Sequence, residues 1–155
     1  MAGIIDARLA ELGITLPEAA APAANYVPYT ISGNQVFVSG QVPFVNGKLQ
    51  YIGKVGVDFT TEDAAKCARI CALNILAQVK AACGGDLDRV VRCVKLGGFV
   101  NCVDGFGEQP KVINGASDLM VEVLADKGRH ARFAVGTNAL PMNVAVEIDA
   151  IFEIS

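Results

Sequence analysis

The clearest hydrophobic pattern lies between residues 60 and 84, where apolar side chains recur at spacings of three and four, as on one face of an α-helix. Thr60 or Thr61 can cap this helix, acidic residues occupy its first turn, and Gly84-Gly85 ends it. Residues 109–127 carry a second stripe of the same kind. Both stretches are predicted to be long helices, each of which packs its apolar face against a flat apolar surface.

Around these helices the pattern changes to that of β-strands. Two β-rich runs flank the turn Ser32-Gly33-Asn34 and predict an antiparallel hairpin. The chain then continues in the order helix, strand, helix and two strands, an order that indicates an internal two-fold repeat. The predicted strands cover residues 29–31, 35–40, 90–103, 131–135 and 144–154.

Strands that share one sheet with both helices on one face leave the other face of the sheet uncovered. The chain of 155 residues is 52% hydrophobic and only 19% charged, so it has apolar surface to spare for a partner. We therefore expect a single α+β domain with a mixed β-sheet and two long helices on one face. Such a domain is expected to assemble into a symmetric oligomer through the bare face of the sheet.

The chain begins with a segment that differs from the rest. Residues 4–12 have a short helical pattern that stops at Gly13, and residues 16–28 are rich in Ala and Pro, which holds no regular element for long. We interpret residues 1–25 as an N-terminal extension and residues 26–155 as the globular domain.

Charge and cysteine content narrow the class of function. The net charge of −3 gives no general attraction to nucleic acid or to anionic membranes. The five cysteines are an odd number in a chain large enough to bury its own core, which argues against a disulfide framework. The chain has no apparent secretory signal and no apolar run long enough to span a bilayer, so we expect a cytoplasmic protein.

Two charged residues stand inside apolar strands. Arg132 lies in Ala131-Arg132-Phe133-Ala134-Val135, where a guanidinium must reach the rim of the sheet or meet an anion. Glu147 lies in an otherwise apolar run and also needs a partner. The simplest hypothesis is a salt bridge between the two. The functional hypothesis is an arginine that binds a ligand carboxylate beside a glutamate that deprotonates water.

Other chemistry-bearing residues give weaker signals. His130 is the single histidine, so a multi-histidine metal site is excluded, and we interpret it as a loop residue. Cys67 and Cys71 are one helical turn apart but lie on the apolar stripe without further ligands, so we expect buried small hydrophobic residues and no metal site.

Several short motifs together resemble the YjgF/RidA family of enamine/imine deaminases. They are Ser39-Gly40-Gln41-Val42-Pro43 after a strand, Asn114 in the second helix, Arg132 on a strand, and Leu140-Pro141 leading to Val146-Glu147-Ile148-Asp149-Ala150. The similarity runs from about Tyr26 to the C-terminus, and the segment from Arg132 to Glu147 is its most specific part.

The resemblance implies a chorismate-mutase-like fold assembled as a homotrimer, with ligand clefts between neighbouring subunits. It implies that Arg132 binds the carboxylate of a small metabolite and that Glu147 positions the attacking water. Tyr26, Ser39, Gly40, Asn114 and Ala134 would line the cleft. The implied reaction is hydrolysis of 2-aminoacrylate and 2-imino acids to 2-keto acids and ammonia, with no metal or organic cofactor.

Two positions depart from the family pattern. Ala134 stands where many deaminases carry a cysteine, and Ser117 stands where a tyrosine is common, so we expect a roomier cleft and a divergent branch. Two other functions remain open: a non-catalytic trimer that binds a 2-keto acid as a signal, and a ribonuclease or translation inhibitor. The acidic charge balance and the single histidine argue against the ribonuclease.

Overall fold

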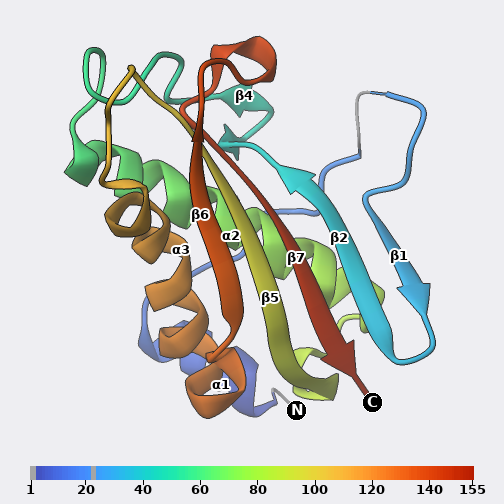
Figure 1. Ribbon diagram of the computed structural model, residues 1–155. Coiled ribbons are helices and arrows are strands. Elements are labelled where there is room, and N and C mark those ends of the chain that lie inside the picture. The colour runs from blue at the N-terminus through green and yellow to red at the C-terminus, as the bar shows by residue number, and fades with distance from the viewer. Residues whose placement is uncertain (1–2, 22–23) are drawn as a thin grey trace.

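The computed structural model describes residues 3–21 and 24–155. Its centre is a five-stranded sheet in the order β1-β2-β7-β5-β6, with α2 (Thr61–Ala82) and α3 (Gln109–Leu124) packed side by side on one face (Figure 1). The strands are β1 (Tyr29–Ser32), β2 (Gln35–Gln41), β5 (Val90–Asn101), β6 (Ala131–Thr137) and β7 (Val146–Ile154). A short α1 (Ile4–Glu11) precedes the sheet, and β3 (Phe44–Val45) pairs with β4 (Lys48–Leu49) in a separate hairpin.

The pairing of the strands makes the sheet mixed. The pairs β1–β2, β2–β7 and β7–β5 are antiparallel, whereas β6 runs parallel to β5 after the crossover through α3. The α+β fold class and the two helices on one face are confirmed, and so are the hairpin and the strand order along the chain.

Both long helices form where their sequence signals place them. The Thr60 hydroxyl accepts a hydrogen bond from the backbone N–H of Asp63 at 3.1 Å and caps α2. α3 ends at Leu124, three residues before the predicted end, because Ala125 adopts a φ of 55°. Residues 125–128 then tighten into a 3₁₀ turn.

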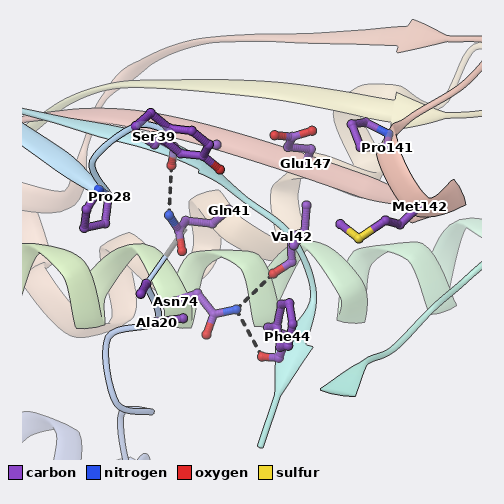
Figure 2. Close-up of a pocket in the computed structure, with 13 residues that line it drawn as sticks. Ala20, Pro28, Ser39, Gln41, Val42, Phe44, Asn74, Pro141, Met142 and Glu147 are labelled. Atoms are coloured by element: carbon purple, nitrogen blue, oxygen red, sulfur yellow. Dashed lines mark hydrogen bonds between the residues drawn. The ribbon is translucent and has the colours of Figure 1, made fainter. Parts of the chain in front are cut away.

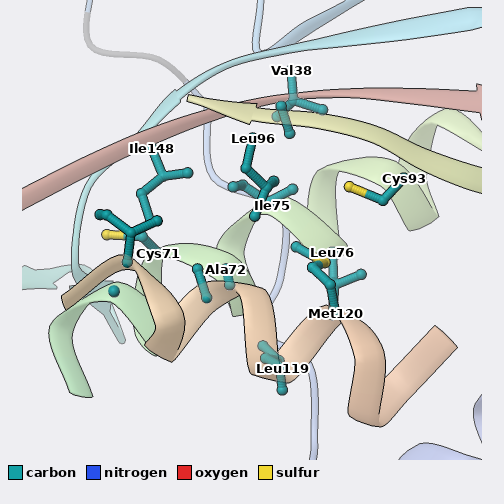
Figure 3. Packing of buried hydrophobic residues seen from close by; sticks show 14 of the residues in the cluster. Val38, Cys71, Ala72, Ile75, Leu76, Cys93, Leu96, Leu119, Met120 and Ile148 are labelled. Carbon is teal, nitrogen blue, oxygen red and sulfur yellow. The ribbon is translucent and has the colours of Figure 1, made fainter. Parts of the chain in front are cut away.

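The hydrophobic core fills the space between the helices and the sheet. Side chains such as Ile75 and Leu76 from α2 and Met120 from α3 meet Leu96 and Ile148 from the strands (Figure 3). All of these side chains are fully buried. The helices approach so closely at Gly115 that a Cβ there would collide with the backbone carbonyl of Ala65. This contact fixes the position of α3, which carries part of the site.

The opposite face of the sheet is bare, as its alternation predicts. Phe37, Phe99 and Val135 are 38%, 40% and 42% exposed on it, although they lie in the middle of strands. Phe99 packs against Phe133 edge to face with ring centroids 5.3 Å apart. An exposed apolar patch of this kind is typical of an interaction surface.

The N-terminal segment packs onto the domain through a few apolar side chains. Ile5 and Leu9 of α1 are buried, and Ile14 and Leu16 contact the core. Asp88 accepts hydrogen bonds from the backbone N–H groups of Ile4 and Ile5 and so anchors the start of α1. Within the described ranges, no helix has both the length and the apolar character needed to cross a membrane.

Candidate functional site

The candidate residues fall into two groups on opposite faces of the sheet. Along β7, Val146 and Ile148 point into the helix-covered core, so Glu147 between them points to the bare face. On β6, Ala134 pairs with Gly98, and a Cβ on Gly98 would meet Ile113 of α3. Ala134, and Arg132 two residues before it, therefore point toward the helices.

Glu147 lies beside an irregularity in β2 that brings further candidates to it. The register between β2 and β7 shifts between Val38 and Gln41, so Ser39 and Gly40 form a bulge next to β7. Gly40 is so close to Glu147 that a Cβ there would overlap the carboxylate. Ser39 donates its hydroxyl hydrogen to the carbonyl of Val27 at 2.7 Å and thereby fastens the segment that carries Tyr26.

These residues line a hollow with a volume of about 220 Å³ (Figure 2). Four of the predicted site residues are among its walls, namely Tyr26, Ser39, Gly40 and Glu147. Glu147 also borders a second hollow on the bare face, together with Phe99, Thr137, Leu140 and Asp149. The carboxylate therefore lies between the two cavities.

The carboxylates on the bare face are electrostatically unusual. Burial raises the pKa of Glu147 above its ordinary value, and the nearby charge of Asp149 raises it further. Burial also raises the pKa of Asp149, although the charge of Lys95 acts in the opposite direction. Within the described residues, no hydrogen bond reaches the Glu147 carboxylate. It is a half-buried acceptor with a raised proton affinity and room for a water molecule beside it.

Arg132 is held against α3 by three hydrogen bonds. Its Nη1 donates to Asn114 Oδ1 at 2.8 Å and to Ser117 Oγ at 3.0 Å, and its Nη2 donates to the Pro110 carbonyl at 3.2 Å. A guanidinium has five N–H donors, so two of them have no partner among the described residues. Two N–H groups are what a bidentate contact to a carboxylate requires.

The salt bridge between Arg132 and Glu147, the simplest hypothesis from the sequence, does not form within one chain. The two side chains point to opposite faces of the sheet. Arg132 forms a hydrogen bond with Asn114 of α3, and Glu147 lines the hollow beside β2. This outcome could not be predicted from the sequence, because the residues around Arg132 on its strand are all apolar and do not show which face its side chain takes.

His130 is a loop residue, as predicted, but it also supports Arg132 indirectly. Its Nδ1 lies 2.6 Å from the Gly128 carbonyl, which can only accept, so Nδ1 carries the hydrogen. In the neutral ring, Nε2 then accepts from the Ser117 hydroxyl at 2.8 Å. Ser117 thus accepts from Arg132 and donates to His130. The sequence showed Ser117 only as a departure from a pattern.

Metal chemistry has no obvious location in the part of the chain that is described. No three of its His, Cys, Asp or Glu side chains are grouped as ligands. Cys67 and Cys71 are fully buried on α2, as predicted, and burial raises the pKa of Cys71 well above its ordinary value.

The mixed sheet with two helices on one face defines an α+β protein of the chorismate-mutase-like class. A family model described as "YjgF/chorismate mutase-like, putative endoribonuclease" matches residues 6–153. The chain therefore belongs to the YjgF/RidA family.

Known relatives cover almost the whole chain. Protein TCP17 of Trypanosoma cruzi is 49% identical over 154 residues, which are 99% of this chain and 96% of that protein. The crystal structure of Atu1372 from Agrobacterium tumefaciens, a protein described as having unknown function, is 56% identical with a TM-score of 0.91, over 97% of this chain and 92% of that one. RidA from the Antarctic bacterium Psychrobacter sp. PAMC 21119 is 28% identical with a TM-score of 0.60, over 90% and 98% of the two chains.

Proposed function

We propose that this protein hydrolyses 2-enamino and 2-imino acids to 2-keto acids and ammonia at a site shared by two subunits. The observation that carries the proposal is the division of the site. An arginine with two N–H donors that no described residue accepts lies on one face of the sheet. A glutamate with raised proton affinity, which no described residue reaches by a hydrogen bond, lies on the other. Each half has one of the two groups that the reaction needs.

The chemistry requires little beyond positioning. The free N–H groups of Arg132 bind the substrate carboxylate and hold the iminium carbon near Glu147 of a neighbouring subunit. Glu147 takes a proton from water as the water oxygen bonds to that carbon, which gives a tetrahedral amino alcohol. Glu147 passes this proton to the nitrogen, and the C–N bond then breaks. Ammonia leaves as the Glu147 carboxylate takes the hydroxyl proton and the keto group forms. The raised pKa of Glu147 suits this exchange, because a base works best when its pKa is near the working pH.

A homotrimer is the assembly that we propose. The bare sheet face exposes Phe37, Phe99 and Val135, and contact between copies through this face would bury them. The second hollow at Glu147 lies on the same face, so a neighbouring chain would come close to the carboxylate. Such a contact could bring Arg132 of one subunit to Glu147 of the next, which a single chain does not do.

The test is ammonia release from imines that an amino-acid oxidase generates in the same solution. The wild-type protein should accelerate the release, and Arg132→Ala should abolish the acceleration without changing the mass of the oligomer. Arg129→Ala is the matched control, because Arg129 is exposed and pairs only at the surface with Asp126. Full activity in Arg132→Ala would contradict the proposed function.

A mixing experiment tests the sharing of the site. Arg132→Ala and Glu147→Gln should each retain only a small residual rate, and each keeps the half-site that the other lacks. After the two variants are unfolded and refolded together in equal amounts, about one quarter of the interfaces should combine both intact halves, because each half has an even chance. Recovery of about a quarter of the wild-type rate supports a shared site, and no recovery contradicts it.

The alternatives predict other outcomes. Binding of a 2-keto acid without turnover of any imine would indicate a signalling or storage role. Ribonuclease activity would need an acid and base pair, and the one histidine is already engaged with Ser117 and the Gly128 carbonyl. We also propose a cytoplasmic location, because the five cysteines are free and buried, as is usual in a reducing compartment.

A further inference from the structure

Two side-chain amides in the wall of the hollow, those of Gln41 and Asn74, and a third on α2 outside that wall are each fixed in one orientation. Gln41 donates to the Ser39 carbonyl at 2.9 Å, and Asn74 donates to the carbonyls of Val42 and Phe44 at 3.0 and 3.1 Å (Figure 2). Gln78, one turn after Asn74 on α2, donates to the Ala20 carbonyl at 2.7 Å. Backbone carbonyls only accept hydrogen bonds, so each NH₂ group must face them and each amide oxygen must point away.

The three amide oxygens have no donor within the described chain. Gln78 Oε1 is fully buried without a partner, and the side-chain oxygens of Asn74 and Gln41 receive no hydrogen bond either. Asn74 as a whole is only 9% exposed, but its amide oxygen and that of Gln41 remain accessible from the hollow. A buried polar atom without a partner is costly, and such atoms normally meet a donor. Water or a ligand group that enters the hollow can donate to the oxygens of Gln41 and Asn74, whereas Gln78 Oε1 does not line the hollow.

The position of these acceptors connects them with the candidate site. Asn74 and Gln41 line the same hollow as Glu147, which therefore runs from the reacting end to the amides. Its volume of about 220 Å³ is far above the roughly 10–15 Å³ of such space that one water molecule needs. The hollow therefore has room for a ligand group as well as for water.

The N-terminal segment forms the wall beyond the amides. Ala20 and Ala21 line this hollow and also an adjoining one, which includes Asn74 and, farther out, Glu18. The bond from Gln78 to the Ala20 carbonyl attaches this segment to α2. The outer end of the path thus combines neutral acceptors with a carboxylate, a set that favours N–H donors over acceptors or apolar groups.

We propose that the amides of Gln41 and Asn74, closed off by residues 17–21, form a subsite for a ligand side chain that ends in an N–H donor. This inference rests on the proposed function: it narrows the substrates to 2-imino acids whose side chains carry an amide or a cationic nitrogen. The N-terminal segment then acts as a specificity element.

Matched substrates test the subsite directly. Asparagine and leucine have side chains of nearly the same shape, and only the asparagine side chain carries N–H donors. The imine of asparagine should be hydrolysed with a kcat/KM roughly tenfold above that of leucine, the effect of one or two well-placed hydrogen bonds. The imine of arginine tests the cationic alternative: a larger preference for arginine than for asparagine assigns a role to Glu18. Equal rates for all three imines would overturn the subsite.

Variants identify the acceptor that is responsible. Gln41→Met removes one amide oxygen with little change in volume and should reduce the asparagine-to-leucine ratio severalfold. Gln35→Met is the control, because Gln35 is exposed at the other end of β2. An unchanged ratio in Gln41→Met, or an equal reduction in Gln35→Met, would contradict the assignment.

A binding measurement separates failure of the subsite from failure of the proposed function. Calorimetry with the 2-keto acids of asparagine and leucine needs no turnover. Tighter binding of the asparagine product, lost in Gln41→Met, supports the subsite even if no imine is hydrolysed. Equal affinity for both keto acids means that the amides bind only ordered water, which overturns the inference.

Discussion

The methyl group added by Gly40→Ala tests the role of Glu147 without replacing the glutamate itself. A Cβ on Gly40 would lie 3.0 Å from Cδ and 3.3 Å from Cγ of Glu147, and closer still to Oε2. The backbone of Gly40 is outside the left-handed region, so alanine fits there and the conflict is confined to the carboxylate. Because the carboxylate is the far end of a flexible side chain, it can retreat by about 1 Å and leave the sheet intact.

A displacement of that size has a large effect on rate and a small effect on stability. Misplacement of a catalytic group by about 1 Å costs on the order of 100-fold in rate. The free energy of unfolding should change by no more than about 1 kcal/mol, because no buried group loses its partner. The measurements are kcat/KM for imine hydrolysis and the midpoint of urea unfolding. Gly107→Ala is the control, since a Cβ on Gly107 meets nothing within 4 Å.

Gly40 also lines the hollow, so its methyl group could block the substrate instead of moving the carboxylate. A double-mutant cycle separates these effects. If the methyl acts through Glu147, Gly40→Ala should reduce the residual rate of Glu147→Gln no further. Independent, multiplying losses, or wild-type kcat/KM in Gly40→Ala, would refute the reasoning.

Three further substitutions follow from the same geometry. Asp149→Asn should lower the pKa of Glu147, because the Asp149 charge raises it, so the acid limb of the pH–kcat/KM profile should move to lower pH; an upward shift or none would contradict this. Ser117→Ala removes one anchor of Arg132 and should raise KM roughly 3- to 10-fold with little change in kcat, whereas a fall in kcat at constant KM would argue against a positioning role. Asn101→Leu should lower the free energy of unfolding, measured with urea, by about 2–4 kcal/mol, because this fully buried amide forms hydrogen bonds with two backbone carbonyls and two side chains. A decrease below about 1 kcal/mol would contradict this prediction.

The elements and the sheet faces could be predicted from the sequence because their signals are local. The stripes on α2 and α3 and the alternation along β7 report burial directly, and the cap at Thr60 has a definite spacing to Asp63. The bulge at Ser39 and Gly40 could not be predicted. A bulge depends on how β2 pairs with β7, and no local pattern in either strand encodes it.

The direction of a charged side chain is predictable only where its neighbours alternate. Glu147 stands between Val146 and Ile148, so alternation alone turns it away from the helices. Arg132 stands in a strand whose other residues are all apolar, so both faces were equally plausible for it. Its direction was decided by pairing with β5 and by acceptors on α3, which the sequence separates from it by 15 to 22 residues.

The separation of Arg132 and Glu147 onto opposite faces of the sheet offers a functional reason for the exposed apolar face, which neither the composition nor the sequence motifs provided. A protein that only needed to bury Phe37 and Phe99 could have replaced them with polar residues at the surface and remained monomeric. Instead, the exposed Phe99 lies on this face beside the carboxylates of Glu147 and Asp149, and Arg132 of the same chain points to the opposite face. An arginine oriented by Asn114 and Ser117 at the edge of the next chain would supply the cation for substrate binding. Under the proposed function, the exposed face and the divided site follow from one arrangement, in which activity depends on assembly.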